Sequence, residues 1–188
     1  MRPLDAPCPP DAPVPPSERG VRVRAIRSSD SAALKRFYCG LSNESRRARF
    51  LHASAGPTPT QCTVFCKTDH DHREGFVAIV DTDGAEYGPI VGHLCLEPDR
   101  SGAAEVAIAV AEDFQHQGIG GLLLTEGVAW ARRERIAQLT ATMFAGNTAI
   151  RRLLIGSGLP AREKYIGAGV TEITIDLDPG STVNGAAA

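Results

Sequence analysis

Hydrophobic and small residues alternate along Ala103–Val110, as expected for a strand with two different faces. One face carries Val106, Ile108 and Val110, and the other carries Glu105, Ala107 and Ala109. A glycine-rich segment follows at Gln115–Gly121, and a helical pattern then runs from Ile119 through Trp130. The pattern predicts a strand, a tight turn and a long helix, which together form the central unit of the chain.

The same periodicities predict the remaining elements. Ser28 and Ser29 are suited to cap the first helix, and Ser42 is suited to open the second. In chain order the expected elements are a strand at Val21–Ile26, helices from Asp30, from Ser42 and around Cys62, strands at Phe76–Asp81 and Ile90–Glu97, the central unit, a strand at Gln138–Phe144, a helix after Asn147, and a hairpin of Lys164–Ile166 and Glu172–Leu177. The strand after the central helix is expected to lie parallel to Ala103–Val110, because the helix forms a crossover. This order predicts a mixed α/β domain around one mostly antiparallel sheet.

The two ends of the chain differ from the rest in composition. Residues 1–20 hold more than half of the 13 prolines, and residues 178–188 are polar or small. Such segments cannot build a packed core, so we expect both to be disordered around a single folded domain at residues 21–177.

Charge and cysteine content restrict the function classes. The formal net charge is −2 and the sequence pI is about 6.2, which does not suggest a partner that is a nucleic acid. No stretch resembles a signal peptide or reaches the length of a membrane span. Five cysteines, an odd number, fit free thiols in a reducing compartment. We therefore expect a cytoplasmic protein that does not contact membranes.

The glycine-rich turn is suited to bind an anion through backbone N–H groups at the start of a helix. It lacks the Gly-Lys-Ser/Thr of a nucleoside-triphosphate loop and the third glycine of a dinucleotide fingerprint. The remaining pattern, Gln115-His116-Gln117-Gly118-Ile119-Gly120, is Q-x-x-G-x-G between a strand and a helix. It resembles the acyl-CoA loop of the GNAT acetyltransferases, and a glycine-rich helix start without a ligand is the alternative.

The resemblance to GNAT domains covers the chain from Val21 to about Leu177, and the front half is similar to the bacterial protein-lysine acetyltransferases of the Pat type. The segments that carry this similarity are Ile26–Asp30, Leu41–Arg46, Arg49-Phe50, Asp69–Asp71 and Ala104–Ala107. Pat relatives often carry a fused regulatory or synthetase-like domain, and the 20 residues before Val21 leave no room for one.

The resemblance implies the GNAT fold, with the parallel strands splayed around acyl-CoA, and acetyl-CoA as co-substrate without a metal. The cofactor-binding residues that it implies are Ile108, Ala109, Val110, Gln115, His116, Gln117, Gly118, Ile119, Gly120, Gly121 and Asn147. Backbone N–H groups of the turn would hold the pyrophosphate, and the strand would pair with the pantetheine arm. The thioester carbonyl would meet an N–H near Ala109 or Val110.

Glu105 is the candidate general base. A lysine amine with a pKa of about 10.4 is almost fully protonated at pH 7, so a base assists its attack. Glu105 lies among small residues, where we expect desolvation to raise its pKa. Pat-type enzymes have their base at this position, and a strand-edge glutamate in solvent or in an ion pair is the alternative.

Other polar residues have two interpretations each. Asn147 is suited to cap its helix, to bind the cofactor, or both, and Arg151 and Arg152 either reach the phosphates or form a solvated face. Cys62, Cys66, His70 and His72 have a spacing that fits one face of a short helix better than a zinc site. Many GNAT enzymes have a tyrosine acid where this chain has Leu154. Tyr38, Tyr87, Tyr165 or water are the substitutes.

The sequence therefore predicts an N-acetyltransferase. The first hypothesis is transfer to a lysine of a protein, for which an acyl-CoA synthetase is a candidate. A small-amine acetyltransferase and a silent acyl-CoA-binding module are the alternatives. Glu105 argues against the silent module, and the Pat-like front half argues against the small amine. We expect a monomer or a weak homo-oligomer.

Overall fold

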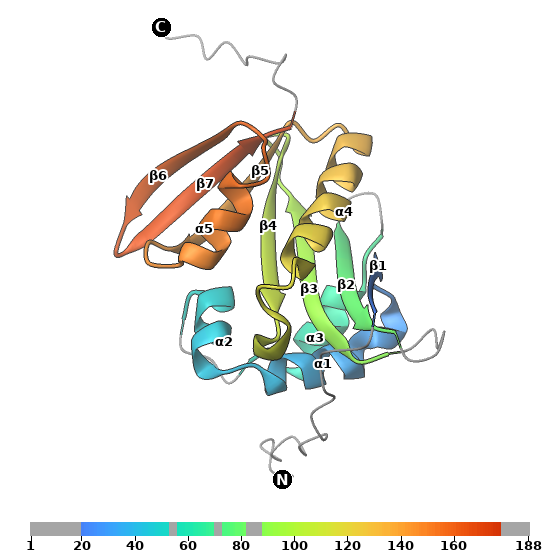
Figure 1. Ribbon diagram of the computed structural model, residues 1–188. Coiled ribbons are helices and arrows are strands. Elements are labelled where there is room, and N and C mark those ends of the chain that lie inside the picture. The colour runs from blue at the N-terminus through green and yellow to red at the C-terminus, as the bar shows by residue number, and fades with distance from the viewer. Residues whose placement is uncertain (1–19, 53–55, 70–72, 82–87, 178–188) are drawn as a thin grey trace, which may run out of the picture.

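A seven-stranded sheet forms the centre of the computed structural model, which describes residues 20–52, 56–69, 73–81 and 88–177. The strand order is β1-β2-β3-β4-β5-β7-β6 (Figure 1). The strands are β1 Val21–Ala25, β2 Glu74–Val80, β3 Ile90–Pro98, β4 Ala103–Val110, β5 Gln138–Phe144, β6 Ala161–Gly167 and β7 Val170–Asp176. All neighbouring strands are antiparallel except β4 and β5. The expectation of a mostly antiparallel sheet with one parallel crossover pair is confirmed.

Helices cover both faces of the sheet (Figure 1). They are α1 Ser31–Gly40, α2 Asn43–Phe50, α3 Pro59–Cys66, α4 Ile119–Arg133 and α5 Thr148–Ile155, with short 3₁₀ turns η1 Ser28–Asp30 and η2 Glu112–Phe114. The crossover helix α4 packs on β2, β3 and β4, and α1 packs on β3 and α3. The two ends of the chain, predicted to be disordered, lie outside the described residues.

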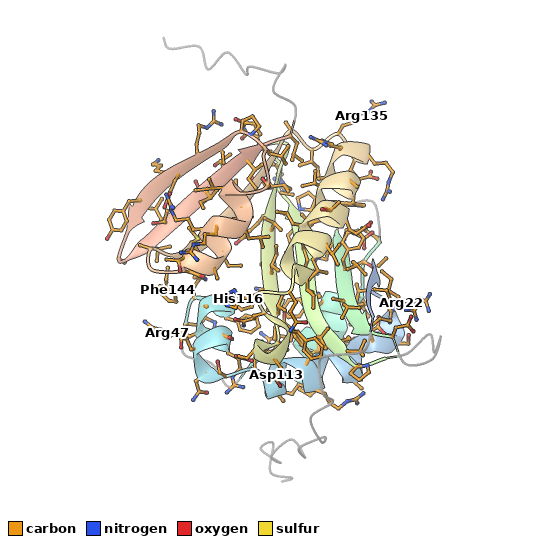
Figure 2. All side chains as sticks on the ribbon, viewed as in Figure 1. Arg22, Arg47, Asp113, His116, Arg135 and Phe144 are labelled. Carbon is orange, nitrogen blue, oxygen red and sulfur yellow. The ribbon has the colours of Figure 1, made fainter. Side chains whose placement is uncertain are left out.

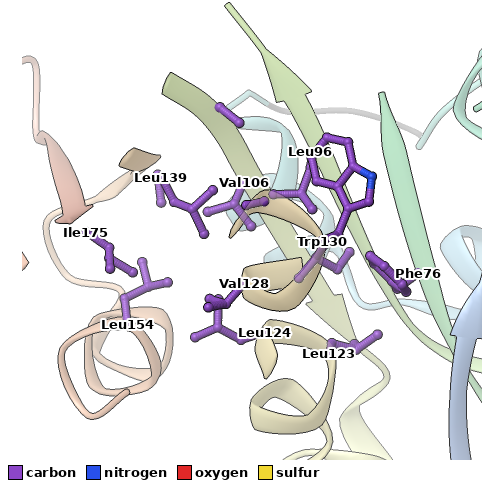
Figure 3. Packing of buried hydrophobic residues seen from close by; sticks show 14 of the residues in the cluster. Phe76, Leu96, Val106, Leu123, Leu124, Val128, Trp130, Leu139, Leu154 and Ile175 are labelled. Atoms are coloured by element: carbon purple, nitrogen blue, oxygen red, sulfur yellow. The ribbon is translucent and has the colours of Figure 1, made fainter. Parts of the chain in front are cut away.

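The larger apolar core joins α4 and α5 to one face of the sheet. Trp130, Leu123 and Leu124 of α4 are buried in the same cluster as Leu139 of β5 and Leu154 of α5 (Figure 3). Burying a side chain of this size contributes about 1.5–3 kcal/mol. Because one continuous core holds both helices, their spacing is set by packing, and this spacing matters for the opening that lies between them.

Gly92 allows α4 to approach the sheet closely. A Cβ atom at this position would lie 3.0 Å from a Leu123 methyl, 3.2 Å from Ala78 and 3.4 Å from Ile119. These contacts are tighter than ordinary packing, so a larger residue would push the first turns of α4 away from β3.

The helix start near Asp30 differs from the expectation. Ser28 and Ser29 do not cap α1; they lie in η1, ahead of the helix. The Asp30 carboxylate is buried, accepts two bonds from the Arg24 guanidinium at 2.7 and 2.8 Å, and accepts a third from the Arg27 N–H at 2.8 Å. Burial opposes the charged carboxyl, but the bonds from Arg24 and Arg27 outweigh it and lower its pKa. An ion pair with an arginine six residues earlier therefore holds the start of α1, where a serine cap was expected.

The second core lies on the other face of the sheet and contains a buried polar pair. The Tyr38 hydroxyl of α1 and Nδ1 of His93 on β3 are 2.8 Å apart, and both residues have no exposed surface. Burial, followed by the positive charge of Arg49, lowers the pKa of His93 to about 3. Burial has the opposite effect on the acidic Tyr38 hydroxyl and raises its pKa. Both groups are therefore neutral near pH 7.

His93 makes the folded protein sensitive to acid. Its folded-state pKa lies below the unfolded value of about 6.5, so below pH 6.5 only the unfolded chain gains this proton. The neutral His93 therefore adds to the free energy of unfolding above pH 6.5. This contribution is lost at up to about 1.4 kcal/mol per pH unit as the pH falls toward 3. The free energy of unfolding in urea, measured between pH 7 and 4.5, should fall with this slope. The His93→Gln protein should take up one proton fewer on unfolding, so its slope should be smaller by up to about 1.4 kcal/mol per pH unit. Equal slopes for both proteins would contradict the assignment.

Candidate active site

The parallel strands β4 and β5 separate halfway along their length. They pair at Ala103 with Gln138, at Ala104 with Leu139 and at Glu105 with Thr140, and the pairing ends there. Beyond this point β5 continues to Phe144 beside β7 alone, and β4 continues to Val110 beside β3 alone. The opening between residues 106–110 of β4 and 141–144 of β5 is called the fork. Glu105 stands at its closed end.

The fork exposes backbone groups of β4 to a ligand. Ala111 N–H donates to Val91 C=O on β3 at 2.9 Å, and hydrogen-bonding direction alternates along an antiparallel strand. The N–H and C=O groups of Val110 and Ile108 therefore point into the fork, while those of Ala109 point to β3. This edge can pair with an extended ligand chain. The direction of the N–H groups favours Val110 over Ala109 as the donor to the thioester carbonyl.

The turn after β4 leaves a set of N–H groups without helical acceptors. His116 and Gly118 have φ values of 61° and 81°, so the chain turns through two left-handed residues before α4 begins. The first helical bond there runs from Leu122 N–H to Gly118 C=O at 3.1 Å, and the N–H groups of residues 119–121 precede it. These N–H groups and the positive end of a 15-residue helix form an anion-binding cradle.

The two glutamines of the turn hold it in place. Gln115 Nε2 donates to the Val110 C=O at 3.0 Å, and Gln117 Nε2 donates to the Asp113 C=O at 2.8 Å. In this structure both side chains are used within the protein, and they fasten the cradle to the end of β4 and to η2.

A groove of about 1030 Å³ connects the fork with the cradle. It is walled by α2 on one side and by the start of α5 on the other. All predicted cofactor-binding residues line this groove except Gln117: they are Ile108, Ala109, Val110, Gln115, His116, Gly118, Ile119, Gly120, Gly121 and Asn147. These residues come together on one surface from residues 108–121 and from Asn147, with the rest of α4 and β5 between them in the chain.

Residues of α2, which the sequence analysis did not assign to the cofactor site, also line the groove. The Arg47 guanidinium lies 4.7 Å from the centroid of the Phe144 ring at the end of β5, so the two side chains bridge the mouth of the fork (Figure 2). Glu112 also lines the groove and accepts a hydrogen bond from Ser42 N–H at 3.0 Å. Burial opposes the charged form of Glu112, but the bonds from Ser42 and Ser45 lower its pKa. The Glu112 carboxylate is therefore occupied by hydrogen bonds at the start of α2, and Glu112 is a poor candidate for a general base.

Glu105 is exposed to solvent at the closed end of the fork, which differs from the desolvated site expected. Its partner on β5 is Thr140, the last pair before the two strands separate. Directly across the strand lies Glu97, whose carboxylate binds Arg73 at 3.0 Å. Glu105 is not among the residues that line the groove.

The half-buried Arg49 lies on the same face of the sheet as Glu105. Arg49 Nη2 donates to Cys95 Sγ at 2.9 Å, and the guanidinium lies 5.0 and 5.9 Å from the centroids of the Phe50 and Phe65 rings. Burial disfavours its charge, but Tyr38, Cys95 and the carboxylate of Glu105 favour it, so its pKa lies above the usual range. Arg49 is therefore a permanent positive charge between the second core and Glu105.

The family model described as Acetyltransferase (GNAT) family matches residues 36–155. This segment contains α2, the fork, the cradle and α5. The chain belongs to the GNAT acetyltransferase family. It is an acetyl-CoA-dependent N-acetyltransferase by this membership, and the resemblance found in the sequence is confirmed.

Two curated relatives of this GNAT protein are acetyltransferases. Acetyltransferase PA5475 of Pseudomonas aeruginosa is 30% identical over 142 residues, which are 74% of this chain and 75% of that protein. Acetyltransferase Pat of Mycolicibacterium smegmatis is 28% identical over 127 residues, which are 66% of this chain. The matched region spans only 37% of the length of Pat.

Solved structures share the GNAT fold. The GNAT domain of S. lividans PAT has a TM-score of 0.73 and 25% identity, with 83% of this chain and 90% of that one covered. The putative acetyltransferase yncA from Salmonella typhimurium, solved with its cofactor acetyl-CoA, has a TM-score of 0.66 and 17% identity. That comparison covers 88% of this chain and 99% of yncA.

This GNAT chain has no tyrosine at the groove among the residues described. Leu154 is buried in the core, and Tyr38 is bonded to His93 on the far face of the sheet. Tyr165 lies on β6 with 64% of its surface exposed, where its hydroxyl accepts a bond from Gly169 N–H. Tyr87 lies outside the described residues. The described tyrosines are therefore unsuited to protonate a leaving group in the fork.

Asn147 does cap α5. Its Oδ1 accepts a hydrogen bond from Ile150 N–H at 3.2 Å while the residue also lines the groove. The capping interpretation is thus confirmed, and cofactor binding by Asn147 stays a prediction.

The cysteines of α3 are buried thiols. Burial raises the pKa of Cys62 to about 11 and that of Cys66 to about 12, so both stay protonated near pH 7 and are poor metal ligands. His70 and His72 lie outside the described residues. Within residues 20–52, 56–69, 73–81 and 88–177, no three potential ligands gather as a metal site would require. The helices in these ranges also include none with the length and hydropathy of a membrane span.

Proposed function

We propose that this protein transfers the acetyl group of acetyl-CoA to the ε-amine of a lysine in a protein. The observation that carries the proposal is the exposed carboxylate of Glu105 at the closed end of the fork. A small amine is usually enclosed by its enzyme, because burial provides its binding free energy. A lysine on a protein brings its own scaffold, and its long side chain can reach an open carboxylate.

The groove supplies the donor side of the reaction. The N–H groups of Gln117–Gly121 would hold the pyrophosphate, and the free edge at Ile108 and Val110 would pair with the pantetheine arm. Ala109 and Asn147 would line the arm. The Val110 N–H would donate to the thioester carbonyl and stabilise the charge that develops on its oxygen.

Glu105 would act as the general base. Its carboxylate accepts a proton from the lysine ammonium or from the attacking amine, directly or through a water. The amine nitrogen then forms a bond to the acetyl carbon, and the bond between that carbon and the sulfur breaks. The thiolate that leaves has a conjugate pKa of about 8.5, so water suffices to protonate it near pH 7. This agrees with the lack of a described tyrosine at the groove.

The relatives support a protein acceptor. Pat of M. smegmatis is similar to this chain over 127 residues, and the GNAT domain of S. lividans PAT covers 83% of this chain. An acyl-CoA synthetase is our candidate partner, in the cytoplasm, with residues 21–177 as the catalytic unit. The alternative acceptor is a small amine.

The acceptor can be identified by labelling. The purified full-length chain, incubated with [¹⁴C]acetyl-CoA and a bacterial lysate, should label a few protein bands, and mass spectrometry should place the acetyl groups on lysines. Boiled enzyme controls for chemical acetylation by the thioester. Label found only in the low-molecular-weight fraction would favour the small-amine alternative and would contradict transfer to protein.

A further inference from the structure

Three arginines line the groove, and two of them already have protein contacts. Arg47 lies on the ring of Phe144, and the half-buried Arg49 lies against two aromatic rings with Cys95 as its acceptor. Arg152 of α5 is exposed and makes no ion pair or hydrogen bond through its side chain with any described residue. It is therefore the arginine of the groove that is free to bind a ligand.

The neighbouring Arg151 shows the contrast. Its Nε donates to Glu163 of β6 at 2.9 Å, on the side of α5 that faces the hairpin. Consecutive residues of a helix point about 100° apart, so Arg152 is directed away from this contact. Arg152 instead shares a helix face with Thr148 and Ala149, four and three residues earlier, and both of these line the groove.

The position of Arg152 relative to the anion cradle is set by packing. A Cβ atom at Gly120 would lie 3.2 Å from a methyl of Leu153, which means that α5 lies directly against the first turn of α4. Arg152 is next to Leu153 in the chain and lies on the groove side of α5. Arg152 therefore lines the groove next to the point where α5 meets the first turn of α4.

Coenzyme A carries two separate phosphate groups, and the cradle offers a binding site for one of them. The cradle binds through neutral backbone N–H groups, and residues 115–121 contain no arginine or lysine. Coenzyme A carries a pyrophosphate and, in addition, a phosphate monoester on the ribose 3′ oxygen, which has close to two negative charges at pH 7. The cradle can take only one of these two groups.

We propose that Arg152 binds the ribose 3′-phosphate of coenzyme A and lets the enzyme distinguish coenzyme A from its 3′-dephospho form. A guanidinium offers paired N–H donors that match phosphate oxygens. The proposal rests on acetyl-CoA as the donor and is independent of the identity of the acceptor.

Calorimetric titration with coenzyme A and with 3′-dephospho-coenzyme A tests the proposal. Wild type should bind coenzyme A about tenfold more tightly than the dephospho form, the size expected for a charge-assisted contact at an exposed site. Arg152→Gln should lose this tenfold preference by weakening coenzyme A alone. Arg151→Gln, the matched control on the same helix, should keep it. In 0.5 M salt the wild-type preference should shrink, because the contact is exposed to screening.

The alternative outcomes separate the possible errors. Equal weakening of both ligands by Arg152→Gln would place the guanidinium on the pyrophosphate and overturn the proposal, as would an unchanged preference. Arg152→Lys should keep part of the preference for coenzyme A. Both Arg152 variants should melt at the wild-type temperature, which separates a lost contact from a folding defect. Wild type that binds neither ligand would overturn the donor assignment itself, and with it the proposed function.

Discussion

Glu105→Gln is expected to lower the turnover number for acetyl transfer to a lysine by about 10²–10⁴-fold at pH 7, the usual contribution of a general base. The substitution keeps the shape of the side chain and removes its ability to take a proton. Affinity for acetyl-CoA should stay near wild type, because Glu105 does not line the groove that holds the cradle and the free edge of β4. Steady-state kinetics with a lysine peptide and calorimetry with acetyl-CoA measure the two quantities separately.

Glu97→Gln is the matched control. Glu97 is the cross-strand partner of Glu105, but its carboxylate is engaged by Arg73. Its removal should change turnover by less than about threefold, the size of a surface ion pair. The difference between wild type and Glu105→Gln should narrow at high pH, where the substrate lysine becomes neutral without help. Full turnover of Glu105→Gln at pH 7 on a protein substrate would show that Glu105 is not the base.

Gly121→Asp is expected to weaken binding of acetyl-CoA by about 100-fold or more. It places a carboxylate in the first turn of α4, where the cradle would hold the pyrophosphate. Two unit charges 4 Å apart repel by about 4 kcal/mol at an effective dielectric constant of 20, so a loss of this size is reasonable. Calorimetric titration measures the dissociation constant directly.

Gly121 is the best of the three cradle glycines for this test. A Cβ atom there meets nothing within 4 Å, whereas Gly118 has a φ of 81° and Gly120 is close to Leu153. The substitution should therefore leave the fold intact, and circular dichroism should confirm this. Gly121→Ala, which adds bulk without charge, should bind acetyl-CoA within about fivefold of wild type. Unchanged affinity in a folded Gly121→Asp protein would exclude the cradle as the phosphate site.

The order and type of the elements could be predicted from the sequence because they depend on local patterns. Alternation identified β4, and the glycine-rich turn before an apolar helical stretch identified the start of α4. The crossover rule then placed β5 parallel to β4. The first helix start was wrong in detail, since Ser28 and Ser29 lie in η1 and the Asp30 carboxylate binds Arg24 of β1.

The sequence by itself determined the strand, the turn and the family, since the motif Q-x-x-G-x-G and the residues before it are contiguous. Only the tertiary structure decided where β4 and β5 separate, and hence that Glu105 is exposed at the closed end of the fork. It also decided that α2 walls the groove and that Arg151 is paired while Arg152 is free. The physical reason is that these features depend on contacts between segments far apart in the chain. Strand pairing, helix packing and ion pairs over such separations leave no periodic signal in the residues that make them.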